Sequence, residues 1–191
     1  MCKIIAIEGP DGAGKSSLCA LVQTRISNKQ IKVFKTPLSS GASLTTYNQY
    51  STEKERFLSY LLSNAITKNI HRNLDYLILD RFTLSTIIYH KNAFESMSGF
   101  VITLLEELEI VPFATVYLDV NREILDSRLS LRHEKTNHKK KSSELLMDFE
   151  HYLSNKDHER YTGNLYRLPS ENNADLEKSF SLIYSLISES L

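Results

Sequence analysis

The sequence predicts an α/β fold in which a parallel β-sheet lies between two layers of helices. Five short apolar runs, rich in β-branched and aromatic residues, alternate along the chain with stretches of helical pattern. Nearly continuous apolar strands separated by helices are typical of a parallel sheet that is covered on both faces. The five runs are residues 3–8, 31–34, 75–80, 114–119 and 164–168.

The first run leads directly into a glycine-rich loop. Residues 9–16 read Gly-Pro-Asp-Gly-Ala-Gly-Lys-Ser, which is the P-loop spacing Gly-x4-Gly-Lys-Ser, and a helical pattern follows. A strand before the loop and a helix after it are the context that makes this motif specific, whereas a plain glycine-rich turn would need neither the Lys nor the Ser. Backbone N–H groups of such a loop wrap a polyphosphate, and the helix N-terminus adds its dipole. We therefore expect ATP to contact Gly9, Asp11, Gly12, Ala13, Gly14, Lys15, Ser16 and Ser17.

Polar groups with defined tasks stand at the ends of the predicted strands. Lys15 is expected to reach the β- and γ-phosphates, and the Ser16 hydroxyl to ligate Mg²⁺. The third and fourth runs end in Asp80 and Asp119, at the sheet edge where ligands bind in open α/β folds. For Asp119 a solvated strand end is an equally good interpretation.

Composition sets the broad class of the protein. The chain has 191 residues, and we expect a single domain spanning 1–191. Lys plus Arg and Asp plus Glu each number 23, so no net charge draws the protein to nucleic acid or to a membrane surface. Cys2 and Cys19 are too few for a disulfide framework, and no apolar run approaches the roughly 20 residues of a membrane span. These features indicate a reducing, cytoplasmic environment.

A basic segment departs from the αβ alternation. Residues 128–143 are polar and weakly periodic, and we predict a short lid over about 128–145. Arg128 and Arg132 are four residues apart, so they share one face if the preceding helix continues. Phosphoryl transfer needs cations that arrive from outside the P-loop and help exclude water. The alternative is a solvated surface loop, which better suits the lysines at 139–141.

Three segments together carry a family resemblance. They are residues 7–16, residues 79–90, in which Asp80-Arg81 is followed by Ser85-Thr86 and Tyr89, and residues 116–123. In order and spacing they resemble the thymidylate kinase family of P-loop nucleoside-monophosphate kinases. The resemblance implies a P-loop NTPase-type three-layer sandwich with a five-stranded parallel sheet and a short lid. It also implies transfer of the ATP γ-phosphate to a deoxynucleoside 5′-monophosphate, by default dTMP to dTDP.

The resemblance also assigns roles to residues. Because position 12 is glycine where some members carry an arginine, the arginine is expected to come from the lid. The implied catalytic residues are Lys15, Arg81, Arg128 and Arg132, and the implied metal site is Ser16 with Asp80. The implied acceptor-binding residues are Asp11, Lys35, Tyr60, Asn64, Arg81, Ser85 and Tyr89.

Several positions depart from the family pattern around the acceptor. Lys35-Thr36 stands where the family usually has Arg-Glu, so Thr36 removes a carboxylate. Tyr60 supplies an aromatic group, but no arginine follows it, and Asn64 or Ser63 takes that place. His90 stands where bacterial members often have Gln. Because a hydrogen-bonding pocket discriminates through its partners, the enzyme class is better supported than the substrate.

Other functions stay open. A related P-loop deoxynucleoside kinase would need a carboxylate base at the end of the second strand, where Thr36 stands. A nucleotide-binding switch, or a catalytically impaired relative, is the alternative from another class. Small-molecule nucleotides are the expected partners, and Mg²⁺ is the only metal implied, because the histidines show no ligand spacing with cysteine. Ile87, Ile88 and Phe94 could contribute to a homodimer, although core packing explains them equally well.

Overall fold

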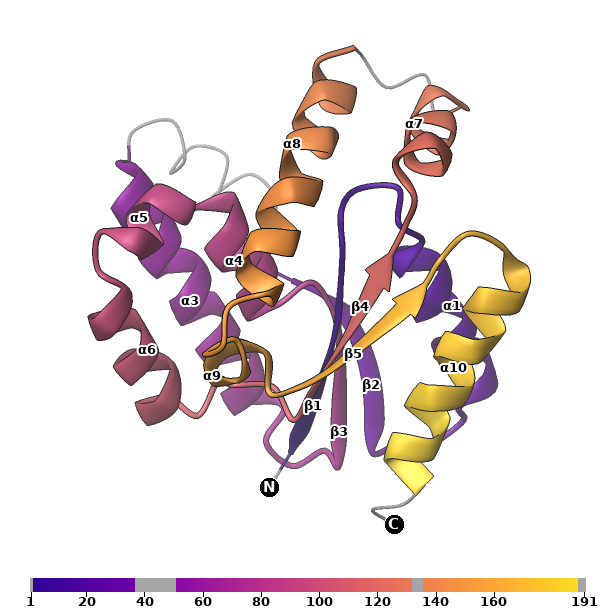
Figure 1. The fold of residues 1–191 in the computed structure, drawn as a ribbon. Helices are drawn as coiled ribbons and strands as arrows, with labels where there is room; N and C mark the ends of the chain where they lie inside the picture. Colours follow the sequence, from indigo (N-terminus) through magenta and orange to yellow (C-terminus); the bar gives the residue numbers. More distant parts are fainter. Residues whose placement is uncertain (1, 37–50, 132–135, 189–191) are drawn as a thin grey trace.

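The computed structural model describes residues 2–36, 51–131 and 136–188, and for 136–143 the backbone alone. These residues form one five-stranded, entirely parallel sheet in the order β2-β3-β1-β4-β5, with helices on both faces (Figure 1). The predicted α/β fold is confirmed. The strands are β1 (Lys3–Glu8), β2 (Ile31–Lys35), β3 (Tyr76–Asp80), β4 (Ala114–Asp119) and β5 (Asn164–Pro169).

Two helical layers enclose the sheet (Figure 1). The first packs on one face and consists of α3 (Glu53–Ile70), α4 (Thr83–Tyr89), α5 (Lys91–Glu95), α6 (Ser98–Glu107), α8 (Thr136–Leu153) and α9 (Glu159–Thr162). The second packs on the other face and consists of α1 (Lys15–Arg25), α7 (Arg122–Leu131) and α10 (Asn173–Ser188).

The central strand shows why the apolar runs are nearly continuous. Along β1, Ile4 and Ala6 belong to the core under α3–α6, whereas Ile5 and Ile7 belong to the core under α1 and α10. Successive side chains of a strand point to opposite faces, so a strand between two helical layers needs apolar residues at every position. Glu8 is the exception: it ends β1 and is completely buried.

Helix α3 begins at a capping box and carries part of the site. The Thr52 hydroxyl accepts a hydrogen bond from the Glu55 N–H at 3.3 Å, and the Glu55 carboxylate accepts one from the Thr52 N–H at 2.6 Å. These reciprocal bonds satisfy free donors at the helix start. Tyr60 and Asn64, one turn apart, thereby come to the end of the sheet where the P-loop lies.

The structure bears on two sequence interpretations. Part of the polar segment 128–143 is helical, because α7 continues to Leu131 and α8 begins at Thr136. Arg132 and the lysines at 139–141 lie outside the residues whose side chains are described. Ile87, Ile88 and Phe94 are buried in the core of the single chain, which confirms the core-packing alternative for this apolar group.

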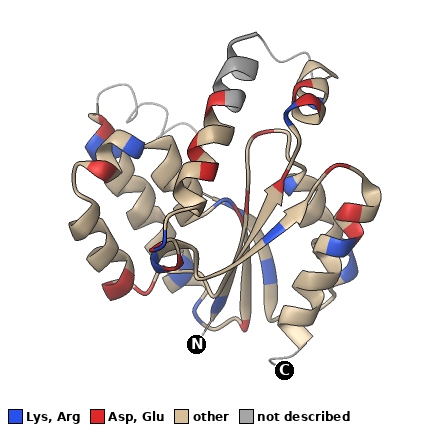
Figure 2. Ribbon diagram, viewed as in Figure 1, with Lys and Arg blue, Asp and Glu red and all other residues tan. Residues whose placement is uncertain are grey.

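The placement of the charged residues and of the two cysteines agrees with what the composition predicts. Acidic and basic residues are interspersed on helices such as α5 and α10 (Figure 2). Cys2 and Cys19 are both buried and free, and burial raises the pKa of the Cys19 thiol to about 12. Within the described ranges, we find no helix with the length and apolar character that crossing a membrane requires.

Candidate active site

The P-loop depends on glycines at two positions of close approach. Gly9 and Gly12 adopt φ angles of +142° and +87°, which L side chains rarely tolerate. A Cβ at Gly12 would lie 2.8 Å from Leu125 Cδ1 of α7, and a Cβ at Gly9 would lie 3.0 Å from the Leu118 carbonyl oxygen. The loop is therefore held between the end of β4 and helix α7, with its backbone free to face a ligand.

A cavity of about 210 Å³ opens beside this loop, at the carboxyl ends of β2 and β3. Backbone N–H groups, cations and one buried carboxylate surround it, which is what a polyphosphate with a metal ion requires. We call it the phosphate cavity, and its lining is Asp11, Gly12, Gly14, Lys15, Ser16, Ser17, Lys35, Asp80 and Arg81.

Lys15 is folded back onto its own loop. Its Nζ donates a hydrogen bond to the Pro10 carbonyl oxygen at 2.7 Å, and its side chain is buried. Burial, helped by the positive charge of Arg81, lowers the pKa of Lys15 to about 8. Lys15 is therefore a cation at neutral pH whose charge is poorly compensated, and an anionic ligand would favour its protonated form.

Ser16 and Asp80 form a pair at the floor of the phosphate cavity. The Ser16 hydroxyl donates to Asp80 Oδ2 at 3.0 Å, while Asp80 Oδ1 is buried and has no hydrogen-bond partner among the described residues. A buried carboxylate oxygen without a donor is costly unless a cation or another group satisfies it. Within the described ranges, no three His, Cys, Asp or Glu side chains gather to hold a metal ion by themselves.

The backbone of Arg81 is held in an unusual conformation. Arg81 has a φ of +72°, which costs a non-glycine residue of the order of 1 kcal/mol or more. Its N–H donates to the Ile7 carbonyl at 3.0 Å, and its own carbonyl accepts from the Thr36 hydroxyl at 2.5 Å. Such strain persists only where neighbours over-determine it, and here β1 and the end of β2 do so.

The Arg81 side chain joins the P-loop to helix α4. Its guanidinium donates to the Gly9 carbonyl at 3.3 Å, to the Ser85 hydroxyl at 3.1 Å and to Asp11 Oδ1 at 2.5 Å. It also stacks over the Tyr89 ring at 5.1 Å, and the Tyr89 hydroxyl donates to Asp11 Oδ2 at 3.3 Å. Burial acts to raise the pKa of Asp11, but Arg81 and Lys15 outweigh it and the pKa is lowered.

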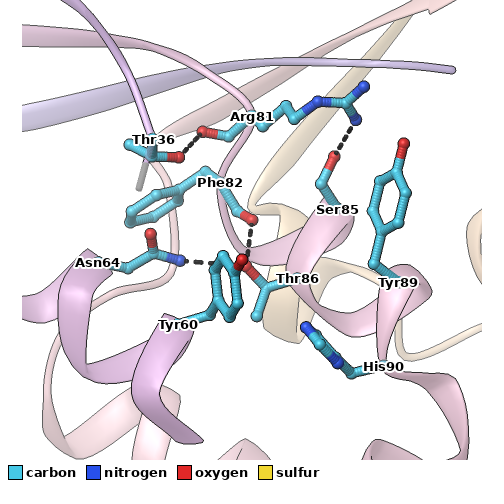
Figure 3. Close-up of a pocket in the computed structure, with 9 residues that line it drawn as sticks. All are labelled: Thr36, Tyr60, Asn64, Arg81, Phe82, Ser85, Thr86, Tyr89 and His90. Carbon is cyan, nitrogen blue, oxygen red and sulfur yellow. Dashed lines mark hydrogen bonds between the residues drawn. The ribbon is translucent and has the colours of Figure 1, made fainter. Parts of the chain in front are cut away.

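A second cavity of about 350 Å³ also has Arg81 in its lining (Figure 3). In it, Asn64 Nδ2 donates to the Thr86 hydroxyl at 3.5 Å, and that hydroxyl donates to the Phe82 carbonyl at 2.9 Å. The His90 ring lies 5.3 Å from the Tyr60 ring, and burial lowers the pKa of His90. We call it the acceptor cavity, and its lining is Thr36, Tyr60, Asn64, Arg81, Phe82, Ser85, Thr86, Tyr89 and His90.

Helix α7 and the loop after β5 close the other end of the P-loop. The Arg128 guanidinium donates to the Gly12 carbonyl at 3.2 Å and to the Glu171 carbonyl at 2.9 Å. The Ser170 hydroxyl donates to the Ala13 carbonyl at 2.6 Å. Arg128 therefore already touches the P-loop, whereas Arg132 lies outside the described residues.

The structure brings most of the sequence-predicted residues together. Tyr60, Asn64, Ser85 and Tyr89 line the acceptor cavity, Asp11 and Lys35 line the phosphate cavity, and Arg81 lines both. Asp119 lies in neither lining and pairs with Arg167 at 2.9 Å, as a strand-end residue does.

Sequence reasoning left out some lining residues and one buried carboxylate. Phe82 and Thr86 follow the Asp-Arg pair, and their four-residue spacing on α4 could have indicated a shared face. Glu8 also had a signal, because it is an acidic residue at the end of an apolar strand. Phe82, Thr86 and Glu8 were given no place in the site, whereas Thr36 and His90 were noted only as departures from the family pattern around the acceptor.

Comparisons with known proteins show the family and the fold of the chain. The sequence model described as thymidylate kinase matches residues 7–175. The chain belongs to the thymidylate kinase family. A thymidylate kinase of Legionella pneumophila (strain Corby) is 31% identical over 140 residues, which cover 64% of this chain and 66% of that relative. Family membership places the chain among the phosphotransferases and implies ATP as the phosphoryl donor, with nucleotides as substrates.

Solved structures share the fold at low sequence identity. The thymidylate kinase of Candida albicans superposes with a TM-score of 0.66 at 16% identity, covering 99% of this chain and 92% of that chain. The deoxyadenosine kinase of M. mycoides with bound dATP also has a TM-score of 0.66, at 19% identity over 97% of this chain and 99% of that chain. Identities this low establish the common architecture alone.

Proposed function

We propose that this protein transfers the γ-phosphate of ATP to the 5′-phosphate of a deoxynucleoside monophosphate, with dTMP as the default acceptor. The observation that carries the proposal is the position of Arg81, whose guanidinium lies between the phosphate cavity and the acceptor cavity. A donor and an acceptor bound in these two cavities would meet with their phosphates at one arginine.

Phosphoryl transfer between two nucleotides requires that the reactants be positioned and that the negative charge of the transferring group be neutralised. A phosphate oxygen of the acceptor attacks without a strong base, so the protein must align the reactants and stabilise the charge on the transferring group. Lys15 supplies a point charge from the P-loop. Arg81 supplies a planar fork that suits paired phosphate oxygens. Arg128 and Arg132 complete the set from the lid side.

The acceptor cavity favours a monophosphate over a free nucleoside. Its described lining contains no Asp or Glu side chain. A nucleoside kinase acts on a sugar hydroxyl and needs a base to take its proton. Thr36 stands at the end of β2, and its hydroxyl is engaged with the Arg81 carbonyl. The runner-up activity, a deoxynucleoside kinase, therefore lacks its base in this part of the structure.

The residues present fit a magnesium ion. The Asp80 carboxylate accepts a hydrogen bond from the Ser16 hydroxyl at Oδ2, and its buried Oδ1 has no donor among the described residues. Mg²⁺ prefers oxygen ligands and usually keeps waters and substrate phosphates around it, so two protein groups suffice. When bound there, the ion would neutralise charge on the β- and γ-phosphates. Ser16 and Asp80 would hold it, directly or through water.

The lining of the acceptor cavity suits more than one nucleobase on the acceptor nucleotide. The Candida albicans thymidylate kinase is described as having a broad substrate specificity, and the M. mycoides protein is a deoxyadenosine kinase. In this chain, hydrogen-bonding groups such as those of Asn64, Thr86 and His90 line the acceptor cavity. Thymine, cytosine and adenine all offer hydrogen-bonding groups to such a lining.

A coupled ADP-release assay with ATP and Mg²⁺ tests the proposal. The acceptors are the four deoxynucleoside monophosphates, their ribonucleotide counterparts and the free nucleosides. We expect turnover with one or more deoxynucleoside monophosphates. Turnover with nucleosides alone would establish the runner-up activity instead. No turnover with any acceptor, together with retained ATP binding, would favour a nucleotide-dependent switch.

The surface also supports a homodimer. Leu58, Leu62, Ile66 and Ile70 follow one another at four-residue spacing on α3, and each is between 36% and 65% exposed. An apolar row of this length on one helix face is typical of an interaction surface. Sedimentation equilibrium of the wild type and of Leu62→Glu tests it. A wild-type dimer that becomes monomeric in the variant is the expected result.

A further inference from the structure

A buried carboxylate beside the site has no part in the reaction described above. Glu8 ends β1, immediately before the P-loop, and none of its surface is exposed. Buried carboxylates are rare unless hydrogen bonds or cations compensate the lost hydration. The partners of Glu8 therefore indicate what it is there to do.

Glu8 holds the beginning of helix α4. Oε1 accepts hydrogen bonds from the Phe82 N–H at 2.8 Å and from the Ser85 N–H at 3.2 Å, and Oε2 accepts a short one from the Ser85 hydroxyl. The residue at the N-cap position of α4 is Phe82, which has no side chain able to cap. Glu8 thus supplies from β1 the acceptors that a capping side chain normally supplies locally.

The hydrogen bonds continue from Ser85 to Arg81. Arg81 Nη1 donates to the Ser85 hydroxyl oxygen at 3.1 Å (Figure 3). A serine hydroxyl has one proton, and a carboxylate can only accept, so that proton is directed at Glu8. The Ser85 oxygen therefore presents a lone pair to the guanidinium. We call this chain of two hydrogen bonds the relay, and its donors all point one way, from Arg81 through Ser85 to Glu8.

We propose that Glu8 is a positioning residue that orients the Arg81 guanidinium toward the acceptor phosphate through the Ser85 hydroxyl. This inference rests on the proposed function, because it assumes that Arg81 binds the acceptor. Burial raises the pKa of Glu8 above its usual value, although the hydrogen bonds from Ser85 and Phe82 and the charge of Arg81 act to lower it. Glu8 is itself a member of neither cavity lining, and it contacts the lining of the acceptor cavity at Phe82 and Ser85, so its effect on the acceptor passes through these residues.

Glutamine is the informative replacement at this position. Glu8→Gln keeps the size and one carbonyl oxygen, so it can still accept from the backbone of α4. Its NH₂ group, however, faces the Ser85 hydroxyl and must donate to it. The serine proton is then displaced toward Arg81, which is also a donor. The substitution reverses the relay while largely preserving the packing.

The experiment separates the two substrates of the reaction. For wild type and Glu8→Gln, KM is measured for the acceptor monophosphate at saturating ATP, and for ATP at saturating acceptor. We expect the acceptor KM to rise about tenfold, since hydrogen bonds to a charged group are the stronger ones, and the ATP KM to stay within about twofold. Ser85→Ala should raise the acceptor KM similarly. The double variant should be no worse than either single one, because the residues act as one unit.

A remote variant controls for loss of stability. Thr115→Val removes a buried hydrogen bond of 2.6 Å to the Thr162 carbonyl, and Thr115 lies in neither cavity lining. It should lower Tm without changing the acceptor KM. An active wild type with an unchanged acceptor KM in Glu8→Gln would overturn the inference alone. So would equal rises of both KM values. A wild type that turns over no monophosphate would overturn the proposed function, and the inference with it.

Discussion

The phosphate cavity and the acceptor cavity share Arg81, yet they are built in different ways. The phosphate cavity is mostly one continuous segment, the P-loop, whose backbone conformation is set by Gly9, Gly12 and Gly14. The acceptor cavity is made of side chains from the residue after β2, from α3 and from the segment after β3. One site thus depends on the backbone, and the other on side chains from distant parts of the chain.

The two cavities also differ in the charge of the side chains that line them. The phosphate cavity holds Lys15, Lys35 and the Asp80 carboxylate, whereas the described lining of the acceptor cavity has Arg81 and no Lys, Asp or Glu side chain. Charge suits a group that every nucleotide carries, and neutral hydrogen-bonding groups suit a base that must be distinguished. The two halves of the site can therefore change independently, except at Arg81.

Replacing Arg81 should break the connection between the cavities and have the largest effect. For Arg81→Ala we expect kcat/KM for the acceptor to fall about 10³-fold, because a transferring phosphoryl group loses its bidentate donor. Arg81→Lys keeps the charge without the planar fork and should recover only part of the rate. Steady-state kinetics measures both. A fall in kcat/KM of less than tenfold in Arg81→Ala would show that Arg81 does not have a central role in phosphoryl transfer.

Replacing either arginine of the predicted lid segment should have the next largest effect on catalysis. Arg128→Ala and Arg132→Ala are each expected to lower kcat more than about tenfold, because cations from outside the P-loop neutralise the transferring group. Lys140→Ala is the matched control, since it removes a positive charge from the same basic segment and should change kcat little. Equal, small effects from all three would show that the segment is only a charged surface.

The pH dependence of ATP binding sharpens the electrostatic contrast. In the free protein the pKa of Lys15 is lowered to about 8, and bound phosphates favour its protonated form. ATP affinity should therefore be constant below that pH and fall by up to about tenfold per pH unit above it. Calorimetry in buffers of different ionisation enthalpy should detect proton uptake on binding. Lys15→Arg, which stays protonated, should show no uptake; uptake in both proteins would assign it to another group.

The smallest expected effect concerns Thr36, where the family usually has a carboxylate. Thr36→Val removes the hydroxyl that donates to the Arg81 carbonyl and should cost about 1 kcal/mol, or roughly fivefold in acceptor kcat/KM. Thr36→Ser keeps the donor and is the control. A fall of the same size in both variants would mean that the methyl group, rather than the hydrogen bond, supports Arg81.

The acceptor side shows where prediction from the sequence stopped. Tyr60 and Asn64 could be placed because they match helix positions that contact the base in the family, and Ser85 and Tyr89 because they follow a recognisable Asp-Arg pair. Thr86 was not assigned to the site, since its role depends on Asn64 from a helix about twenty positions earlier. Contacts between distant elements leave no periodic signal in the chain.

By itself, the sequence determined the five parallel strands and the P-loop, because strand patterning and loop spacing are local properties of the chain. The family resemblance, and no local pattern, implied that Ser16 and Asp80 share a site. The arrangement of the side chains around the two cavities follows from the tertiary structure. It holds Arg81 at a positive φ, seats Leu125 of α7 against Gly12, and directs Ser85 toward the buried Glu8. Each of these depends on residues that are remote in sequence and meet only when the sheet and its helices pack.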